Sequence, residues 1–189
     1  MQPLAYMAST TILESQKLAI FGGLTQDPNG HFKTTNEILF FDLATHEWQK
    51  PGKVFAEAIE DVPSERMGAE IVTYGDKLWI YAGAQPVTND NPTETTFSDF
   101  YSFDLVTGVW KRETGYGAMN DEVGEILGKA VRLYNTDAAV FFGGCDAEKK
   151  TCSFDQGREI LFEQPNANFV MAQKAEGEGY AGREGHSLI

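Results

Sequence analysis

Cysteine is scarce in this sequence of 189 residues, which contains only Cys145 and Cys152. Two cysteines are too few for a disulfide framework, and their spacing is not the C-x-x-C of a zinc or redox site. We therefore expect reduced thiols. The alternative is a disulfide that closes a short hairpin loop, since two cysteines flanking a β–β connection can meet at an acceptable Cα separation.

Basic residues are also in the minority, because 15 Lys and Arg against 28 Asp and Glu give a formal net charge of -13. Phosphate binding is built on clustered Lys and Arg, so we expect no nucleic-acid partner. An acidic surface repels anionic lipid as well. Two interpretations of the acidity stay open: it keeps the protein soluble, or it steers a basic protein partner towards the surface.

Long apolar runs are missing too, since no stretch approaches the ~20 residues of a membrane-spanning helix. The amino end, residues 1–17, lacks the basic and apolar blocks of a secretory signal. We therefore expect a soluble protein without membrane insertion, located in the cytoplasm or on the cytoskeleton. An extracellular location is the alternative if Cys145 and Cys152 are disulfide-bonded.

Catalytic groups are few. The sequence has only three histidines, His31, His46 and His186. It contains no G-x-S-x-G, no H-E-x-x-H and no phosphate-binding glycine loop. Residues 89–91 with Glu94 are rich in oxygen ligands, but Pro92 and the spacing indicate a turn rather than a calcium site. We therefore expect no catalytic residue, no metal and no cofactor.

Glycine, by contrast, is plentiful at 19 residues, which is typical of many tight turns between short strands. Apolar or alternating runs predict strands at 17–21, 37–41, 77–81, 100–103, 138–142 and 160–162. Most of these runs are bounded by turn residues, as at 27–30 and 75–76. Helical patterning is weak, and we expect at most one helical turn, within 54–60.

The sequence repeats itself. Tyr6 to Gly23 aligns without gaps with Arg66 to Gly83 at an offset of 60, and a third copy, Leu127 to Gly144, follows at an offset of 61. Each copy predicts a strand, a turn and a second strand that ends in small residues. A glycine pair at that end allows a sharp turn and lets a neighbouring sheet approach closely.

The second half of each unit repeats as well. Phe41 to Trp48 matches Phe103 to Trp110 in its aromatic residue, its acid and its tryptophan, and 162–169 is a degenerate third copy with Phe169 in place of Trp. This spacing predicts a hairpin in which the aspartate caps the turn amides and the tryptophan fills the space between adjacent sheets. Burying such an indole removes about 150 to 250 Å² of surface from water.

These residues resemble the kelch repeat, which has an Arg-x-Gly-His opening, an apolar run before Gly-Gly, and an aromatic-Asp pair six residues before Trp. Arg66 to Ala69 nearly matches the opening, and Arg183 to His186 matches it fully. The departures are Tyr6 to Ala8 at the first opening, Ala82 in place of a glycine, and the missing third tryptophan.

The resemblance implies an all-β fold, a segment of a kelch-type β-propeller with four-stranded antiparallel blades. We divide residues 1–189 into blade units at approximately 6–65, 66–126 and 127–182, with a further repeat beginning at 183–189. Three blades do not close a ring, and an open array leaves a blade face in water. We therefore expect further blades from a longer polypeptide or from another chain.

Function in such a scaffold lies in its loops, because the strands are committed to packing. The long loops are 24–35, 84–98 and 145–157 after the glycine pairs, and 49–65, 111–126 and 170–182 between blades. The expected partner-binding residues in them are Phe55, Glu57, Glu60, Asp61, Phe97, Tyr116, Asp121 and Glu122. The aromatic members are either exposed anchors or plugs of the sheet edges.

Arg66 and Arg183 hold equivalent positions, and we expect each to be buried against an acid. The favoured hypothesis is a non-enzymatic scaffold that binds protein partners, within a larger assembly. The alternative is part of a propeller enzyme, an oxidase or a sugar-processing type, with its catalytic residues on blades outside this segment.

Overall fold

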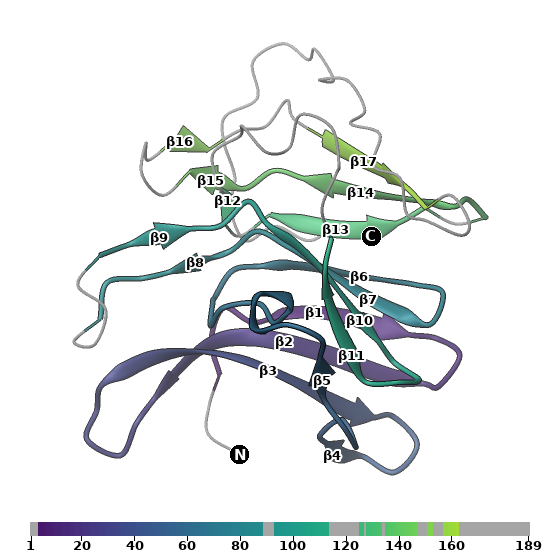
Figure 1. The fold of residues 1–189 in the computed structure, drawn as a ribbon, viewed down its shortest axis with the longest axis horizontal. Coiled ribbons are helices and arrows are strands. Elements are labelled where there is room, and N and C mark those ends of the chain that lie inside the picture. The colour runs from purple at the N-terminus through teal and green to yellow at the C-terminus, as the bar shows by residue number, and fades with distance from the viewer. Residues whose placement is uncertain are drawn as a thin grey trace.

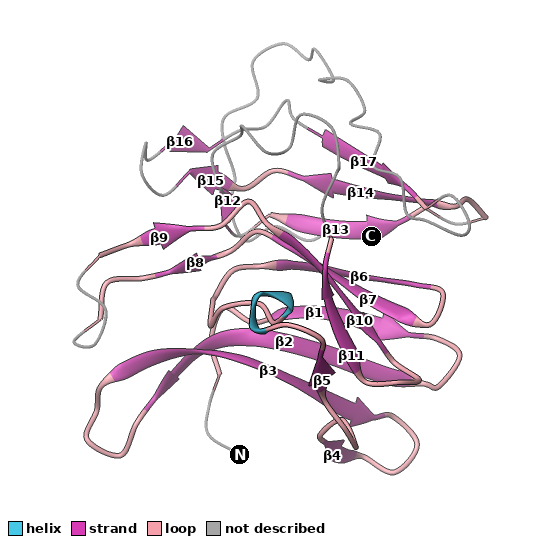
Figure 2. Cartoon of the chain, in the orientation of Figure 1, coloured by secondary structure: helices cyan, strands magenta, loops and turns pink. Residues whose placement is uncertain are grey.

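The computed structural model describes residues 4–88, 93–113, 125–126, 128–133, 135–146, 151–152 and 157–162. These residues form strands and turns, together with one 3-10 turn, η1 (Ile59–Asp61) (Figure 2). The all-β prediction is confirmed, and η1 lies near the single helical turn expected at 54–60. No helix in this part of the chain is long and apolar enough to cross a membrane.

The first blade is a four-stranded antiparallel sheet whose strands follow one another in sequence order. Its strands are β1 (Ala8–Ile12), β2 (Lys17–Gln26), β3 (Phe32–Asp42) and β4 (Glu47–Gln49). β2 and β3 are much longer than their predicted runs, because they stay paired from Lys17↔Asp42 to Gln26↔Phe32 across a bulge after Phe21. The expected loop 24–35 is therefore mostly strand.

The second blade has the same antiparallel order and one additional edge strand. Its strands are β6 (Glu70–Tyr74), β7 (Lys77–Tyr81), β10 (Phe100–Asp104) and β11 (Val109–Arg112), with β5 (Phe55–Ala56) parallel to β11. The expected loop 84–98 begins and ends in a short ladder of β8 (Ala84–Gln85) with β9 (Thr95–Thr96).

The third blade is described in part. Its strands are β13 (Lys129–Arg132), β14 (Ala138–Phe142) and β17 (Gly157–Leu161), and a small sheet beside it consists of β12 (Glu125–Ile126), β15 (Cys145–Asp146) and β16 (Thr151–Cys152). β14 has the predicted bounds. β17 begins three residues before its predicted run and ends at Leu161.

The three blades fan out from their first strands, as expected for consecutive blades of a propeller (Figure 1). β1 packs beside β6, and β6 packs beside β13. One apolar core, which includes Phe21 and Trp110, joins the first two blades. A second core, which includes Trp79 and Phe141, joins the second blade to the third. Burial between sheets therefore holds the array together.

The predicted aspartate-capped hairpins are confirmed in both described copies. The backbone N–H groups of Ala44 and Thr45 donate to Asp42 Oδ1 at 2.9 and 3.0 Å. Asp104 Oδ1 accepts the corresponding pair of N–H groups in the second blade, at 2.7 and 3.0 Å. The hydrogen bond from Thr45 is the main cause that lowers the pKa of Asp42. In Asp104 burial raises the pKa, but the turn hydrogen bonds outweigh it and the net shift is downward.

The gapless alignment of the first repeat is wrong by two residues in its opening strand. Ala8 faces Phe21 across the first hairpin, whereas Glu70 faces Tyr81 in the second. Phe21 and Tyr81 are 60 residues apart but Ala8 and Glu70 are 62 apart, because the β1–β2 turn is longer by two residues than the β6–β7 turn. Position 66 therefore corresponds to Leu4, not to Tyr6.

The alignment of the third unit is also shifted by two residues. Ala139 holds the place of Leu78 relative to the small-residue pair that follows, and Ala139 faces Ile160 where Leu78 faces Phe103. Ile160, not Phe162, is thus the counterpart of Phe103. Phe162 instead stacks on Tyr74 at 4.1 Å in the core between blades two and three. Phe169, the expected counterpart of Trp, lies outside the described residues.

The glycine pair allows the close approach that the sequence predicts. Gly22 has a φ of +64°, and a Cβ added there would lie 2.5 Å from the carbonyl oxygen of Arg66 in the next blade. The backbone N–H of Gly23 donates to that same oxygen at 2.8 Å. Since no side chain fits between these backbones, the glycine pair fixes how one blade meets the next.

The expected reduced state of the cysteines is not what the structure contains. Cys145 is disulfide-bonded, and Cys152, the only other cysteine of the sequence, is its Cα partner across β15 and β16. The alternative drawn from the sequence, a disulfide across a short hairpin, is therefore the correct one. Its physical basis is the register, which sets the two cysteines opposite each other.

Candidate functional site

The face of the first blade that points away from the second is the first candidate. We call it the open face and define it by alternate residues of its strands: Leu18, Ile20, Leu39, Phe41 and Trp48. Trp48 packs on Phe41 at 5.0 Å between ring centroids, and Trp110 packs on Phe103 at the same 5.0 Å. The predicted equivalence of the two tryptophans is thus confirmed.

The surroundings of the two tryptophans differ. Trp110 is 3% exposed and meets Phe21 of the first blade edge-on, at 5.8 Å between ring centroids. Trp48 is 44% exposed. The expected role of filling the space between sheets is therefore confirmed for Trp110, whereas Trp48 lies on a face that no other described blade covers.

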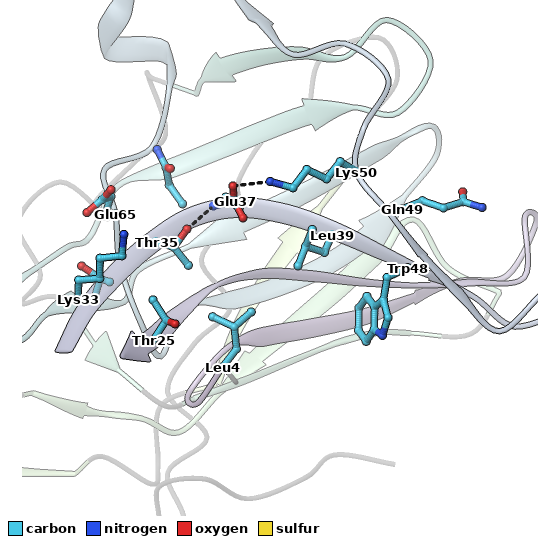
Figure 3. A pocket seen from close by; sticks show the side chains of 12 residues that line it. Leu4, Thr25, Lys33, Thr35, Glu37, Leu39, Trp48, Gln49, Lys50 and Glu65 are labelled. Carbon is cyan, nitrogen blue, oxygen red and sulfur yellow. Dashed lines mark hydrogen bonds and ion pairs between the residues drawn. The ribbon is translucent and has the colours of Figure 1, made fainter. Parts of the chain in front are cut away.

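The open face is hollowed into a groove of about 780 Å³ (Figure 3). Its lining combines an apolar floor with a polar rim: Leu4, Thr25, Lys33, Thr34, Thr35, Asn36, Glu37, Leu39, Trp48, Gln49, Lys50 and Glu65. At the rim Lys50 Nζ lies 2.7 Å from Glu37 Oε1, an exposed pair that screening by solvent leaves weak. Such a lining is suited to contact with another folded surface.

The corresponding place in the second blade is filled by a buried cluster around Arg66, which is 0% exposed. Its guanidinium forms a bidentate pair with the Asp99 carboxylate, donates to the carbonyl of Ala82 at 3.0 Å, and stacks on Phe97 at 4.0 Å. Burial and then the Asp99 charge raise the pKa of Tyr101, whose hydroxyl donates to Asp99. The prediction that Arg66 is buried against an acid is confirmed.

The first blade lacks this cluster. By the corrected register Leu4 stands where the second blade has Arg66, and Glu37 stands where it has Asp99. Position 4 has no arginine, and Glu37 forms an ion pair with Lys50 on the surface instead. The groove is therefore the first blade's counterpart of the buried contact between blades one and two.

The segment that links the first two blades is the second candidate, and it is anchored to the outer edge of the second blade. We call residues 53–61 the strap. Phe55 N–H donates to the carbonyl of Gly108 at 2.8 Å, and Asp61 accepts from the N–H groups of Arg112 and Ala58 at 3.0 and 3.2 Å. These bonds fix the strap against β11 although it contains little regular structure.

The strap exposes apolar and acidic side chains. Ile59 is 90% exposed, Val54 and Phe55 are more than half exposed, and Glu57 and Glu60 are exposed beside them. The backbone of Phe55 covers the edge of the second blade, while its side chain is exposed to solvent. Exposed apolar side chains ringed by acids fit a partner surface that is apolar and basic.

The predicted partner residues lie in different structural settings. Phe55, Glu57 and Glu60 come together on the strap, but the carboxylate of Asp61 is engaged in fixing it. Phe97 covers buried Arg66 and is only partly exposed, so the interpretation as a plug describes it better than that of an anchor.

Three predicted residues, Tyr116, Asp121 and Glu122, lie outside the described residues. Sequence reasoning missed Ile59 and the exposure of Trp48. Ile59 is an apolar residue between acids in a loop, which is a usable signal.

A second cavity, of about 550 Å³, lies where β1, β6 and β13 meet. Hydroxyls line it, and Thr73 Oγ1 donates to the carbonyl of Thr11 at 3.1 Å. Arg132 at its edge stacks over Tyr74 at 5.2 Å. Within the described ranges, no group of three or more His, Cys, Asp or Glu side chains is arranged to hold a metal ion.

Known proteins share this sequence pattern. The chain is 35% identical over 96 residues to an N-(sulfonatooxy)prop-2-enimidothioate sulfolyase of Thlaspi arvense, which covers 50% of this chain and 23% of the relative. It is 31% identical over 77 residues to Kelch repeat-containing protein 2 of Saccharomyces cerevisiae, which covers 41% of this chain and 8% of the relative. The chain thus spans a minor part of both curated relatives.

Solved structures share the fold. The structure of YjhT matches with a TM-score of 0.68 and 15% identity, over 96% of this chain and 54% of that one. A family profile described as the KLHDC2/KLHL20/DRC7 Kelch-repeats domain matches residues 7–189. With its repeated Gly-Gly and Asp-to-Trp elements, and with that match across nearly its whole length, the chain belongs to the kelch-repeat family.

Proposed function

We propose that this chain is a non-enzymatic protein-interaction module of a larger assembly, and that the strap is its principal contact surface. The observation that carries the proposal is the exposure of Ile59 and Phe55 on a segment that hydrogen bonds hold in place. A preorganised segment loses little entropy on binding, so its apolar side chains contribute more to affinity. No cofactor takes part in this function.

The charge of the surface points to the kind of partner. Glu57 and Glu60 flank Ile59, and the chain carries a formal net charge of -13. A partner with Lys or Arg around an apolar anchor would meet complementary charge at the rim, which raises the association rate more than the affinity. We infer that binding weakens as the salt concentration rises.

The test compares two strap variants, which change three exposed positions, in a pull-down from cells expressing the protein. Ile59→Asp removes the apolar anchor, and Glu57→Lys with Glu60→Lys reverses the rim charge. Val106→Asp, in the exposed β10–β11 turn, is the matched control. We expect partner recovery to fall by about tenfold with the strap variants, at an unchanged melting temperature, and to persist with the control. Equal recovery by all variants would contradict the proposal.

A second candidate function is suggested by the sulfolyase of Thlaspi arvense, to which half of this chain is similar. The chain would then be the part of a propeller enzyme that does not carry its catalytic residues. Metal analysis of the full-length protein separates the two functions. Stoichiometric copper or iron would favour the enzyme, and its absence together with strap-dependent recovery would favour the scaffold.

The disulfide bears on location. Disulfides form and persist in oxidising compartments and are rare in the cytosol. We therefore propose a secreted or cell-surface location in place of the cytoplasm. Mass measurement after thiol labelling, with and without reductant, tests the point: protein isolated from its source should take up no label until it is reduced. If both cysteines take up label without reductant, the thiols are reduced, and the result would favour the cytoplasm over the proposed location.

A further inference from the structure

The strap gives the second blade an edge strand whose far side is open. β5 is the last strand in the order β5-β11-β10-β7-β6 and lies at the outer edge of this blade (Figure 1). Within the described residues β5 pairs with β11 alone, in parallel register. Residues 52–57 are all exposed. The side of β5 that points away from β11 therefore faces solvent.

The backbone groups on that side are available for hydrogen bonds. Phe55 N–H donates to the carbonyl of Gly108 at 2.8 Å, so the backbone of Phe55 faces β11. Successive residues of a strand direct their N–H and C=O groups to opposite sides, and Val54 and Ala56 therefore direct theirs outward. In the part of the chain that the structure describes, no strand or loop bonds to these outward groups. Such an edge is a template for a further strand.

The side chains along the edge have two different faces. Val54 and Ala56 point to one face of the strand, and Phe55 points to the other, because side chains alternate along a strand. Val54 and Phe55 are both more than half exposed. The exposed acids Glu57 and Glu60 follow Phe55. A strand laid beside β5 would meet aliphatic side chains on one face, and an aromatic ring with nearby carboxylates on the other.

These two faces define the complementary strand. Aliphatic side chains fit beside Val54 and Ala56, whereas Lys or Arg fits beside the ring of Phe55, which attracts a cation, and near the acids. We propose that the partner of the strap contributes an extended segment of alternating apolar and basic residues, which adds as a further strand along the free edge of β5. The inference rests on the proposed function of the strap and specifies the form of the partner that it binds.

A synthetic peptide tests the proposal directly. The probe is a peptide of alternating valine and arginine with blocked ends, about seven residues long, which is the length of an ordinary strand. Its control contains the same residues in two blocks, so the charge is kept and the alternation is lost. In a calorimetric titration of the whole chain, the alternating peptide should bind about tenfold more tightly than the block peptide, and less tightly as salt increases. Equal binding of the two peptides, or no binding of the alternating one, would overturn the proposal.

Two variants at position 56 isolate the backbone contact. Ala56→Pro removes the outward N–H and leaves the bond from Phe55 to Gly108, since the extended conformation of Phe55 is the one that a following proline favours. Ala56→Val keeps the N–H and is the matched control. Ala56→Pro should weaken peptide binding by about three- to tenfold, as expected for one hydrogen bond, whereas Ala56→Val should bind as the parent does. Equal affinities of the two variants, at unchanged melting temperatures, would contradict strand addition.

Amide hydrogen exchange tests the same contact without a substitution. In the free chain the amide of Phe55 should exchange slowly and that of Ala56 rapidly, because only the first is hydrogen-bonded. The alternating peptide at saturation should slow exchange at Ala56 by about tenfold or more. An Ala56 amide that is already protected in the free chain would show that the edge is covered. Protection that does not rise on binding would also overturn the proposal.

The pull-down with Ile59→Asp distinguishes failure of this inference from failure of the proposed function. If Ile59→Asp lowers partner recovery and Ala56→Pro does not, the strap is the contact surface but the partner adds no strand, so only this inference is wrong. If neither variant lowers recovery, the proposed function is wrong as well. Lower recovery with both variants, together with binding of the alternating peptide, is the expected result.

Discussion

The first and second blades share a hairpin but differ in what it touches. In each, an aspartate caps the turn and a tryptophan packs on the aromatic residue across the strand pair. Trp110 is 3% exposed because the first blade covers it, and Trp48 is 44% exposed. The difference teaches that local sequence builds the blade, while the presence of a neighbouring blade decides how strongly the outer aromatic residues contribute to stability.

The largest effect should separate the two tryptophans. Trp110→Ala should lower the free energy of unfolding by about 3 to 5 kcal/mol, since it removes a fully buried indole from the core between blades. Trp48→Ala should cost about 1 kcal/mol or less, because this indole is already partly exposed to water. Urea unfolding of both variants checks this, and equal losses would contradict the comparison.

The second comparison concerns the opening residues, Arg66 and Leu4. Arg66→Leu should destabilise the protein by about 3 kcal/mol, because it leaves the Asp99 carboxylate without its buried partner. Leu4→Arg should change stability little, since position 4 is only partly buried. Thermal unfolding of the two variants tests the point. A harmless Arg66→Leu would show that the cluster does not stabilise the blade junction.

The third comparison concerns the left-handed turn residue, which is His46 in the first blade and Gly108 in the second. His46 has a φ of +58°, so His46→Gly should stabilise the protein by about 0.5 to 1 kcal/mol. Gly108→Ala should destabilise by more than that, because its Cβ would lie 2.1 Å from the carbonyl oxygen of Lys53 in the strap. Calorimetry measures the change in stability caused by each substitution. We expect the two changes to have opposite signs.

A smaller effect should follow pH. The pKa values of Asp42 and Asp104 lie below the ordinary 3.8 in the folded protein, so their stabilising contribution is complete above 3.8. It is lost as the pH falls through 3.8 and the lowered folded values. The free energy of unfolding is measured from about pH 5 down to about pH 2.5. It should fall less steeply with decreasing pH in an Asp42→Asn, Asp104→Asn double variant than in the parent protein. Parallel curves would contradict the assignment.

The repeat is predictable from the sequence because several of its positions require one particular type of residue. Gly22 must lack a Cβ, Asp42 must accept two turn amides, and Trp110 must fill the space between sheets. Each requirement is local and leaves a pattern in the sequence. The strands at 77–81 and 138–142 were therefore predicted with their observed bounds.

The parts that were not predicted depend on pairing at a distance. A turn that is longer by two residues shifts the first strand without changing its apolar pattern. The shift that makes Leu4 the counterpart of Arg66 is therefore visible only in the strand register. The strap is anchored by backbone groups of Gly108 and Arg112, which any residue supplies. The disulfide at Cys145 depends on β15 facing β16.

The contact between Phe21 and Trp110 tests the central claim, that consecutive kelch blades pack with the tryptophan of one against the strand end of the other. A double-mutant cycle to alanine should give a coupling energy of about 0.5 to 1.5 kcal/mol for this pair. The matched pair of Phe21 and Trp48, which lie on opposite faces of the first blade, should show no coupling. Zero coupling between Phe21 and Trp110, or equal coupling for both pairs, would contradict the account.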